Sequence, residues 1–168
     1  MDLGLRGKAA VVSGTALAAE GAKVVVNGRT EARVAAALDK IRHRVANAEL
    51  CGVAADLGTA NGVDAFLKQV TEADVLVNNL GIFEVKPFAE IPDADWMRLF
   101  EVNVLSGVRL TRKYLPRMLK KNWGRVIFIS SERGQHIPAE IIPSALPRPP
   151  RWPSRADSRN RWPEPVSP

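Results

Sequence analysis

The 168-residue sequence has little of what marks secreted, membrane-bound or metal-binding proteins. It has one cysteine, Cys51, so it forms no internal disulfide. No apolar run approaches the ~18 residues that a membrane-spanning helix needs. Met1–Lys8 has neither a long apolar segment nor a small-residue cleavage site, so no signal peptide is predicted there. His, Cys and carboxylate residues do not cluster at metal-ligand spacing, so we expect no metal site. These absences favour a cytoplasmic protein with no membrane partner.

Positive charge is concentrated towards the carboxyl end. The chain carries a net charge of +6, and residues 143–168 hold five arginines against two acidic residues. The many prolines of this segment are incompatible with the interior of a helix or a sheet. We therefore predict an ordered part over residues 1–142 and a Pro/Arg-rich disordered tail over residues 143–168.

Five short apolar runs have the composition of buried parallel strands. They are Lys8–Ser13, Lys23–Asn27, Glu49–Ala55, Asp74–Asn79 and Gly124–Ser130. Apolar residues at helical spacing lie between them, over residues 30–46, 58–72 and 92–121. Thr30 is expected to cap the first of these helices, and Pro116 to bend or interrupt the last. This alternation predicts an α/β fold: a Rossmann-like, doubly wound parallel sheet, incomplete at about five strands and followed by an irregular tail.

The connection between the first two strands is short. Between Gly14 and Lys23 the sequence has only TALAAEGA. A crossover between parallel strands, including its helix, needs at least about ten to twelve residues. We therefore expect no crossover helix of normal length at this point.

Four polar motifs follow the predicted elements in order, mostly at strand ends. They are Asp56-Leu57, Asn78-Asn79-Leu80-Gly81, Asn103 within EVNV on the long helix, and Ser130-Ser131. The carboxyl ends of parallel strands meet at one edge of the sheet, where α/β folds bind their ligands. Taken together, the motifs resemble those of the short-chain dehydrogenase/reductase family, from Leu5 to about Ile142.

The resemblance implies a partial NAD(P)-binding domain over residues 1–142. It also implies NAD(P)-dependent hydride transfer to or from a small carbonyl or alcohol substrate. It implies cofactor contacts for residues of the first turn and of the motifs after the third and fourth strands. These residues are Gly14, Asp56, Leu57, Asn79, Leu80 and Gly81, and the end of the second strand adds Asn27, Gly28 and Arg29.

The resemblance places the catalytic positions at Asn103 and Ser131. Ser131 would hold the substrate oxygen, and Asn103 would anchor a helix-bound water in the proton path. Each residue also has a plainer interpretation. Asn103 would be a buried structural amide, Ser131 a hydroxyl that satisfies the backbone at a strand end, and Asp56 a helix cap. Asn78 and Asn79 would be turn residues.

The end of the second strand bears on the choice between NADP and NAD. It reads Asn27-Gly28-Arg29, and in an NAD enzyme an acidic residue would usually bind the ribose 2′-hydroxyl there. With Gly28 in that place, Arg29 is available to face a 2′-phosphate, so the resemblance implies that NADP is preferred to NAD. The alternative is that Arg29 is a solvated charge at the start of a helix.

Two departures from the family pattern affect its chemistry. The family's TGxxxGxG turn cradles the pyrophosphate, but here Ser13-Gly14-Thr15 runs directly into ALAAEG, so cofactor binding is expected to be weak. By resemblance, a Tyr-x-x-x-Lys pair should lie about thirteen residues after the Ser. Ser144 and Arg148 occupy those positions, and a Ser hydroxyl is far too weak an acid for the task of the Tyr. We therefore expect little or no turnover.

The composition of the tail suggests its origin. When Ser144–Pro168 is back-translated and the frame moved by one base, one permitted reading is an alanine-rich amphipathic helix with a Thr-Lys pair. We hypothesise a reading-frame shift near codon 143, which sequencing of the coding DNA tests. This origin explains the Arg/Trp-rich tail better than nucleic-acid binding does, so no nucleic-acid partner is expected.

A second function class remains open for the chain. The elements that the family places after the fifth strand are missing, which would leave an apolar face uncovered. The chain would then be a non-catalytic fragment that associates with another subunit. Family members form homo-oligomers, and for this chain that assembly is in doubt.

Overall fold

The computed structural model describes residues 4–11 and 15–130. Five strands form one parallel sheet in the order β3-β2-β1-β4-β5. They are β1 (Ala9–Val11), β2 (Lys23–Gly28), β3 (Leu50–Ala54), β4 (Val75–Asn78) and β5 (Arg125–Phe128). The predicted Rossmann-like α/β class with about five parallel strands is confirmed.

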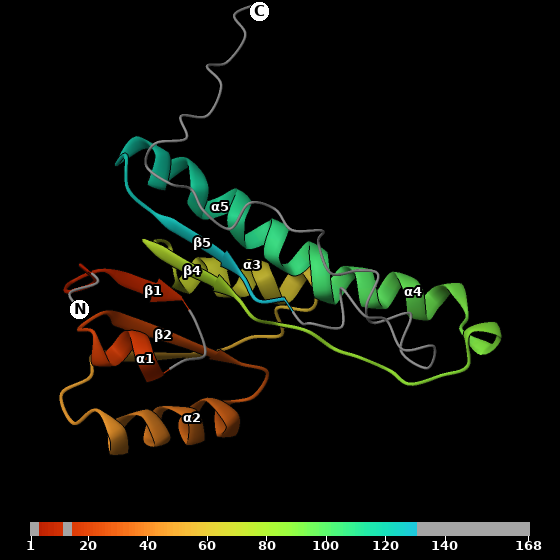
Figure 1. Ribbon diagram of the computed structural model, residues 1–168, viewed down its shortest axis with the longest axis horizontal. Helices are drawn as coiled ribbons and strands as arrows, with labels where there is room; N and C mark the ends of the chain where they lie inside the picture. Colours follow the sequence, from red (N-terminus) through yellow and green to blue (C-terminus); the bar gives the residue numbers. More distant parts are fainter. Residues whose placement is uncertain (1–3, 12–14, 131–168) are drawn as a thin grey trace, which may run out of the picture.

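Helices cover the sheet on both faces (Figure 1). They are α1 (Thr15–Ala19), α2 (Glu31–Arg44), α3 (Ala60–Gln69), α4 (Asp93–Phe100) and α5 (Ser106–Lys120), with a 3₁₀ turn η1 (Phe88–Glu90) and a π turn η2 (Glu101–Leu105). One buried cluster, which includes Phe66 and Tyr114, joins α3 and α5 to the sheet. The other, which includes Val24 and Ile41, joins α1 and α2 to the opposite face. Thr30 caps α2 as predicted, because its hydroxyl accepts a hydrogen bond from the Arg33 N–H.

The short first crossover contains a helix of five residues, α1. This helix ends in a Schellman motif: Ala22 N–H donates to the Leu17 carbonyl, and Gly21 N–H donates to the Ala18 carbonyl, both at 3.1 Å. Gly21 has φ +79°, the left-handed conformation that this motif requires. Ala18 and Ala22 are small and almost fully buried, so the helix lies close to the sheet. β1 and β2 therefore pair in parallel despite the abbreviated connection.

The predicted single helix over residues 92–121 is divided in the structure. α4 and α5 are separated by the π turn η2, whereas α5 continues through Pro116. The expected interruption at Pro116 is therefore wrong. Pro116 lies on the exposed side of α5, where the Arg112 carbonyl that loses its N–H partner can be solvated by water. The break at Glu101–Leu105 has no proline or glycine, and it surrounds Asn103.

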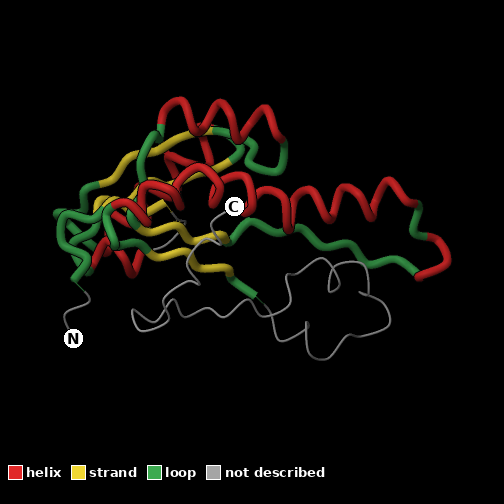
Figure 2. The backbone as a smooth tube through the Cα atoms, turned by 90° about the horizontal axis from the view of Figure 1, so that it is seen from above, coloured by secondary structure: helices red, strands yellow, loops and turns green. Residues whose placement is uncertain are grey.

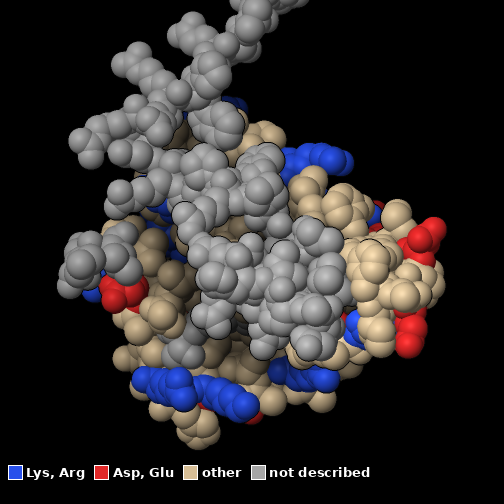
Figure 3. Space-filling model, turned by 45° about the vertical axis from the view of Figure 1, so that its right-hand side comes forward, with Lys and Arg blue, Asp and Glu red and all other residues tan. Residues whose placement is uncertain are grey.

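α4 and the loop before it extend beyond the sheet as an arm (Figures 1 and 2). Lys86 contacts Asp95 and Glu84, and Arg98 contacts Glu84, so ion pairs hold the loop against α4. The Phe88 ring meets Trp96 edge-on at 6.3 Å. On this side of the molecule, uncharged surface lies beside acidic side chains (Figure 3). These ion pairs and the ring contact therefore join the loop to α4 within the arm.

Asp74 joins three segments at the amino-terminal edge of the sheet. Its carboxylate accepts from the Ala9 N–H at 3.2 Å and from Lys121 Nζ at 2.9 Å, and its carbonyl accepts from the Arg125 N–H. Burial alone would raise the pKa of Asp74. The hydrogen bonds from Lys121 and Ala9, with the positive charges of Lys121 and Lys8, outweigh burial and lower the pKa below its ordinary 3.8.

Asp74→Asn is expected to lower the free energy of unfolding by about 1 kcal/mol at pH 7. Because the folded-state pKa is depressed, the ionised carboxylate stabilises the fold above the unfolded-state pKa. This contribution is lost as the pH falls through the folded-state pKa. Urea unfolding at a series of pH values should therefore show the variant and the wild type converging in acid. Asp39→Asn, which breaks an exposed pair with Arg42, is the control and should change stability by less than about 0.5 kcal/mol. A constant Asp74→Asn difference down to about pH 2 would contradict this account.

Candidate functional site

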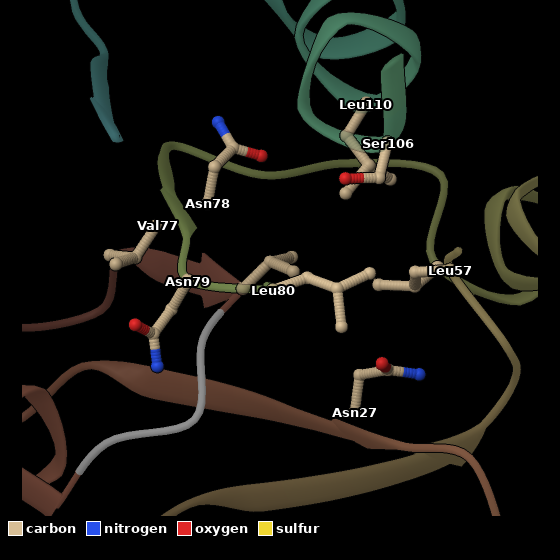
Figure 4. Close-up of a pocket in the computed structure, with 9 residues that line it drawn as sticks. Asn27, Leu57, Val77, Asn78, Asn79, Leu80, Ser106 and Leu110 are labelled. Atoms are coloured by element: carbon tan, nitrogen blue, oxygen red, sulfur yellow. The ribbon is translucent and has the colours of Figure 1, made fainter. Parts of the chain in front are cut away.

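The strand order reverses between β1 and β4, and a cavity lies at this point at the carboxyl edge of the sheet. Such a reversal is where open α/β sheets bind their ligands. The cavity has a volume of about 140 Å³. Its walls are mostly aliphatic, with three asparagines and one serine, and the lining residues are Val11, Asn27, Leu57, Val77, Asn78, Asn79, Leu80, Ser106 and Leu110 (Figure 4).

Four predicted site residues meet at this cavity: Asn27, Leu57, Asn79 and Leu80. They come from β2, from the segment after β3 and from the loop after β4, so the topology brings together residues that are distant in sequence. In Figure 4, Leu80 and Leu57 extend towards each other across the cavity. Gly81 follows Leu80 on an exposed part of the same loop.

The side-chain amide of Asn78 is buried at the end of β4 without a hydrogen bond. Neither Nδ2 nor Oδ1 has a partner, and both atoms are inaccessible to solvent. α5 packs closely here, because a Cβ added to Gly107 would lie 2.7 Å from the Phe128 ring and 3.2 Å from Asn78 Cγ. An unpaired buried amide is costly, and such groups are typically found where a ligand or a water completes the bonding. The Asn78 amide is therefore an unsatisfied polar group in the wall of the cavity.

Asn103 fastens the loop after β4 to the π turn. Its Oδ1 accepts from the Ile82 N–H at 2.8 Å, and its Nδ2 donates to the Ile82 carbonyl at 3.0 Å. Both ends of the side-chain amide are thus paired with the backbone of one residue. π turns often occur at functional sites, and here the turn presents the amide to the loop. In the structure, Asn103 is a positioning residue for the segment that borders the cavity.

Replacing Asn103 by Leu is expected to cost about 2 kcal/mol, because it leaves the Ile82 N–H and carbonyl without partners. Amide hydrogen exchange at Ile82 should accelerate as well. A global loss of stability alone would not accelerate exchange at this amide in particular. Asn61→Leu, at an exposed position of α3, is the matched control. Unchanged exchange at Ile82 in the Asn103 variant would show that the pair does not hold the loop.

Asp56 forms a tight turn between β3 and α3. Its Oδ1 accepts from the Gly58 N–H at 3.0 Å, and its carbonyl accepts from the Thr59 N–H and hydroxyl. Thr59, not Asp56, is the N-cap of α3, since its hydroxyl accepts from the Gly62 N–H. The helix-cap interpretation of Asp56 is therefore wrong. The Asp56 side chain is exposed beside the buried Leu57.

The three residues at the end of β2 have different roles. The Asn27 amide nitrogen donates to the Val53 and Ala55 carbonyls at 3.0 and 3.1 Å, so both its N–H groups join β2 to β3. Gly28 lies under α2, where an added Cβ would be 3.1 Å from the Val34 side chain. Arg29 is exposed at the start of α2.

Tyr114, the single tyrosine of the chain, is part of the core. It is 1% exposed, its hydroxyl donates to the Val70 carbonyl at 2.7 Å, and burial raises the pKa of its phenol. A phenol held in this way is not available to a substrate. Gly14, Ser131, Ser144 and Arg148 lie outside the described residues, as does the 143–168 tail.

The sequence prediction missed four residues of the cavity wall: Val11, Val77, Ser106 and Leu110. The Ser106 hydroxyl donates to the Val102 carbonyl at 2.6 Å, which explains why it is buried. Its place three residues after Asn103, on the same side of the helical segment, was the signal in the sequence that could have identified it.

In residues 4–11 and 15–130, no group of three or more His, Cys, Asp or Glu could hold a metal ion. None of the helices described is long and apolar enough to cross a membrane.

Known proteins resemble the chain in both sequence and structure. The short chain dehydrogenase family matches residues 7–143. The uncharacterized oxidoreductase YvaG of Bacillus subtilis is 47% identical over 154 residues, which cover 86% of this chain and 56% of YvaG. D-beta-hydroxybutyrate dehydrogenase of Cupriavidus necator is 33% identical over 77% of this chain and 55% of its own length.

Among solved structures, L-sorbose reductase from Gluconobacter frateurii, complexed with NADPH and L-sorbose, superposes with a TM-score of 0.81 at 28% identity. The match covers 88% of this chain and 61% of the reductase. The chain thus spans little more than half the length of the curated relatives that it matches. With the family match extending over most of its residues, the chain belongs to the short-chain dehydrogenase family.

Proposed function

We propose that this chain carries the dinucleotide-binding part of an NADP-linked short-chain oxidoreductase, and that it binds the cofactor weakly and turns over little or no substrate. The observation that carries the proposal is the cavity at the strand-order reversal, where four of the predicted cofactor-binding residues meet. Two solved relatives contain a cofactor of this class and support the proposal: L-sorbose reductase is complexed with NADPH, and a metagenomic short-chain oxidoreductase is complexed with NADP.

The residues at the carboxyl edge fit part of such a cofactor. Asn78 offers a buried, unpaired amide, and Asp56 has one carboxylate oxygen, Oδ2, that the turn does not use. A carboxylate can accept from an adenine amino group, and the exposed Arg29 guanidinium suits a 2′-phosphate. A cavity of about 140 Å³ is smaller than the ~300–1,000 Å³ of typical ligand pockets, which agrees with weak binding.

The substrate that we propose is a small carbonyl compound or the corresponding alcohol. When bound, the cofactor supplies or takes up the hydride at the carbon that bears the oxygen. The chain's own contribution is to place groups around that carbon: Asn103 holds the loop after β4, and Ser131 would hold the substrate oxygen. The proton donor of the family is replaced, since Ser144 stands where the Tyr is expected. Cofactor binding and catalysis are therefore separable in this chain.

Calorimetric titration of the full chain with NADPH and with NADH tests the cofactor proposal. We expect NADPH to bind about tenfold more tightly than NADH, and Arg29→Gln to remove that difference without weakening NADH. Arg44→Gln, at the far end of α2, is the matched control. Tighter binding of NADH would overturn the NADP preference. A folded chain that binds neither would overturn the cofactor proposal as a whole.

A further inference from the structure

The π turn η2 changes the hydrogen bonding of Ser106, the residue that follows it. In an α-helix the Ser106 N–H would donate to the Val102 carbonyl, four residues earlier. Here it donates to the Glu101 carbonyl, five residues earlier, as a π turn requires. The Ser106 hydroxyl donates to the Val102 carbonyl instead, at 2.6 Å. One side chain thus supplies the bond that the π turn removes from the Ser106 backbone.

The same side chain forms part of the cavity wall. Ser106 is 4% exposed and lines the cavity from the helix (Figure 4). A buried hydroxyl is costly unless it is hydrogen-bonded, and the bond to the Val102 carbonyl meets that requirement. The shape of the turn and this part of the cavity wall therefore depend on one hydrogen bond.

Two adjacent residues of the π turn contact two segments that line the cavity. Both amide atoms of Asn103 bond to the backbone of the loop after β4, which carries Leu80. Val102 packs against the turn after β3, because a Cβ added to Gly58 would lie 3.1 Å from Val102 Cγ2. That turn carries Leu57, which also lines the cavity. The π turn therefore contacts both segments at once.

We propose that Ser106 is a positioning residue for the cofactor site, because its hydroxyl fixes the π turn that holds both segments. The cofactor part of this inference rests on the proposed function. Without the hydroxyl, the Val102 carbonyl can regain the Ser106 N–H, and the turn becomes an ordinary α-helical turn. Removing one residue from a helical turn rotates the residues on its two sides by about 100° relative to each other. Val102 and Asn103 could not keep both contacts after such a rotation.

Ser106→Ala in the full 168-residue chain tests the inference by amide hydrogen exchange. The Ile82 amide bonds to the Asn103 side chain and the Gly58 amide lies in the turn after β3, so each amide reports on one segment. Both should exchange roughly five- to tenfold faster relative to the Val24 amide, which lies at the amino-terminal edge of the sheet. A general loss of stability would accelerate all three amides alike.

Thr111→Val is the matched control on the same helix. The Thr111 hydroxyl is buried without a hydrogen-bond partner, so its removal breaks no bond. Exchange at the Ile82 and Gly58 amides, relative to Val24, should stay unchanged in this variant.

A second set of variants tests the contact between Val102 and the turn after β3. Gly58→Ala places a methyl group against Val102 and should accelerate exchange at the Ile82 amide, in the other segment. Val102→Ala removes the obstruction, so the double variant Gly58→Ala/Val102→Ala should exchange more slowly at Ile82 than Gly58→Ala does. Such non-additivity is expected of residues in contact. These variants also test the inference if Ser106→Ala does not fold.

Calorimetric titration with NADPH adds the functional readout. Ser106→Ala should weaken NADPH binding about fivefold, and Thr111→Val should leave it unchanged. Unchanged affinity in Ser106→Ala would overturn the cofactor part of the inference. Acceleration at only one of the two amides, or at neither, would overturn the positioning role, as would a double variant that exchanges at Ile82 as fast as Gly58→Ala. If the folded chain binds no NADPH, the proposed function fails, whereas the exchange results still decide the role of Ser106.

Discussion

The protein is expected to oxidise NADPH in the presence of small carbonyl substrates at a rate at least ~10²–10⁴ times below that of a version in which the Tyr general acid is restored. That factor is the usual loss when one general acid is removed. The weak cofactor binding that we propose would reduce the rate further, because the sequence of the first turn lacks the glycines whose backbone N–H groups hold a pyrophosphate. The absorbance of NADPH over time measures this rate directly.

No other tyrosine is available to replace the missing acid. The Tyr114 hydroxyl donates a hydrogen bond to the Val70 carbonyl in the core, and burial raises the pKa of the phenol, which makes it a weaker acid. Tyr114→Phe should therefore destabilise the protein by about 1 kcal/mol and change no residual turnover. A decrease in turnover on this substitution, at constant folded fraction, would show that Tyr114 takes part in the reaction.

The restored version needs both missing parts. It carries a glycine-rich turn inserted after Ser13 and a Tyr and a Lys in place of Ser144 and Arg148. L-sorbose reductase, whose structure holds NADPH and L-sorbose, is the positive control for the assay. Turnover by the unmodified chain that approaches this control would refute the expectation. Versions that carry only one of the two repairs separate the two defects. Restoring the glycine-rich turn alone should mainly increase cofactor affinity, and restoring the Tyr/Lys pair alone should mainly increase the rate at saturating cofactor and substrate.

The strands were predictable because a buried parallel strand needs a continuous apolar run, and each of the five has one. Val24 and Leu76, near the middle of two such runs, are buried. The ends of the elements were less certain, since caps and turns decide them: α3 begins at Ala60 because Thr59 caps it, not at Gly58 as predicted. The π turn was not predictable from periodicity. The turn contains Asn103, whose side chain bonds to Ile82, and these two residues are 21 positions apart in the sequence.

The residues of the candidate site were likewise predictable from the sequence only in part. Motif positions predicted Asn79 and Leu80, because a strand end can be recognised from sequence. Val11 and Leu110 could not be found in this way, since only the strand order brings β1 and α5 to the same cavity. Asn27 was predicted as a cofactor contact, and the structure shows its amide nitrogen engaged with β3. Its cofactor role remains a prediction that depends on its oxygen alone.

Gly62→Ala is expected to destabilise the protein by at least about 3 kcal/mol, although glycine-to-alanine changes inside helices normally stabilise by about 1 kcal/mol. A methyl group at Gly62 would overlap the Asp56 carbonyl oxygen and lie 3.0 Å from the Thr59 hydroxyl oxygen. The Asp56 carbonyl belongs to the backbone and already accepts two hydrogen bonds from Thr59, so no side-chain rotation relieves the overlap.

The sign of this effect separates close packing from helix propensity. Asn61→Ala, one residue earlier and exposed, should be neutral or slightly stabilising, because propensity alone acts there. Denaturant unfolding of both variants gives the comparison, and a stable Gly62→Ala protein would show that the turn is looser than the structure describes. The consequence extends to the site. α3 carries Val63 and Phe66 into the core, and the same turn positions the Asp56 carboxylate and Leu57. A shift large enough to admit the methyl group must move the cavity wall as well, so we expect NADPH affinity to fall even in the folded fraction of the variant.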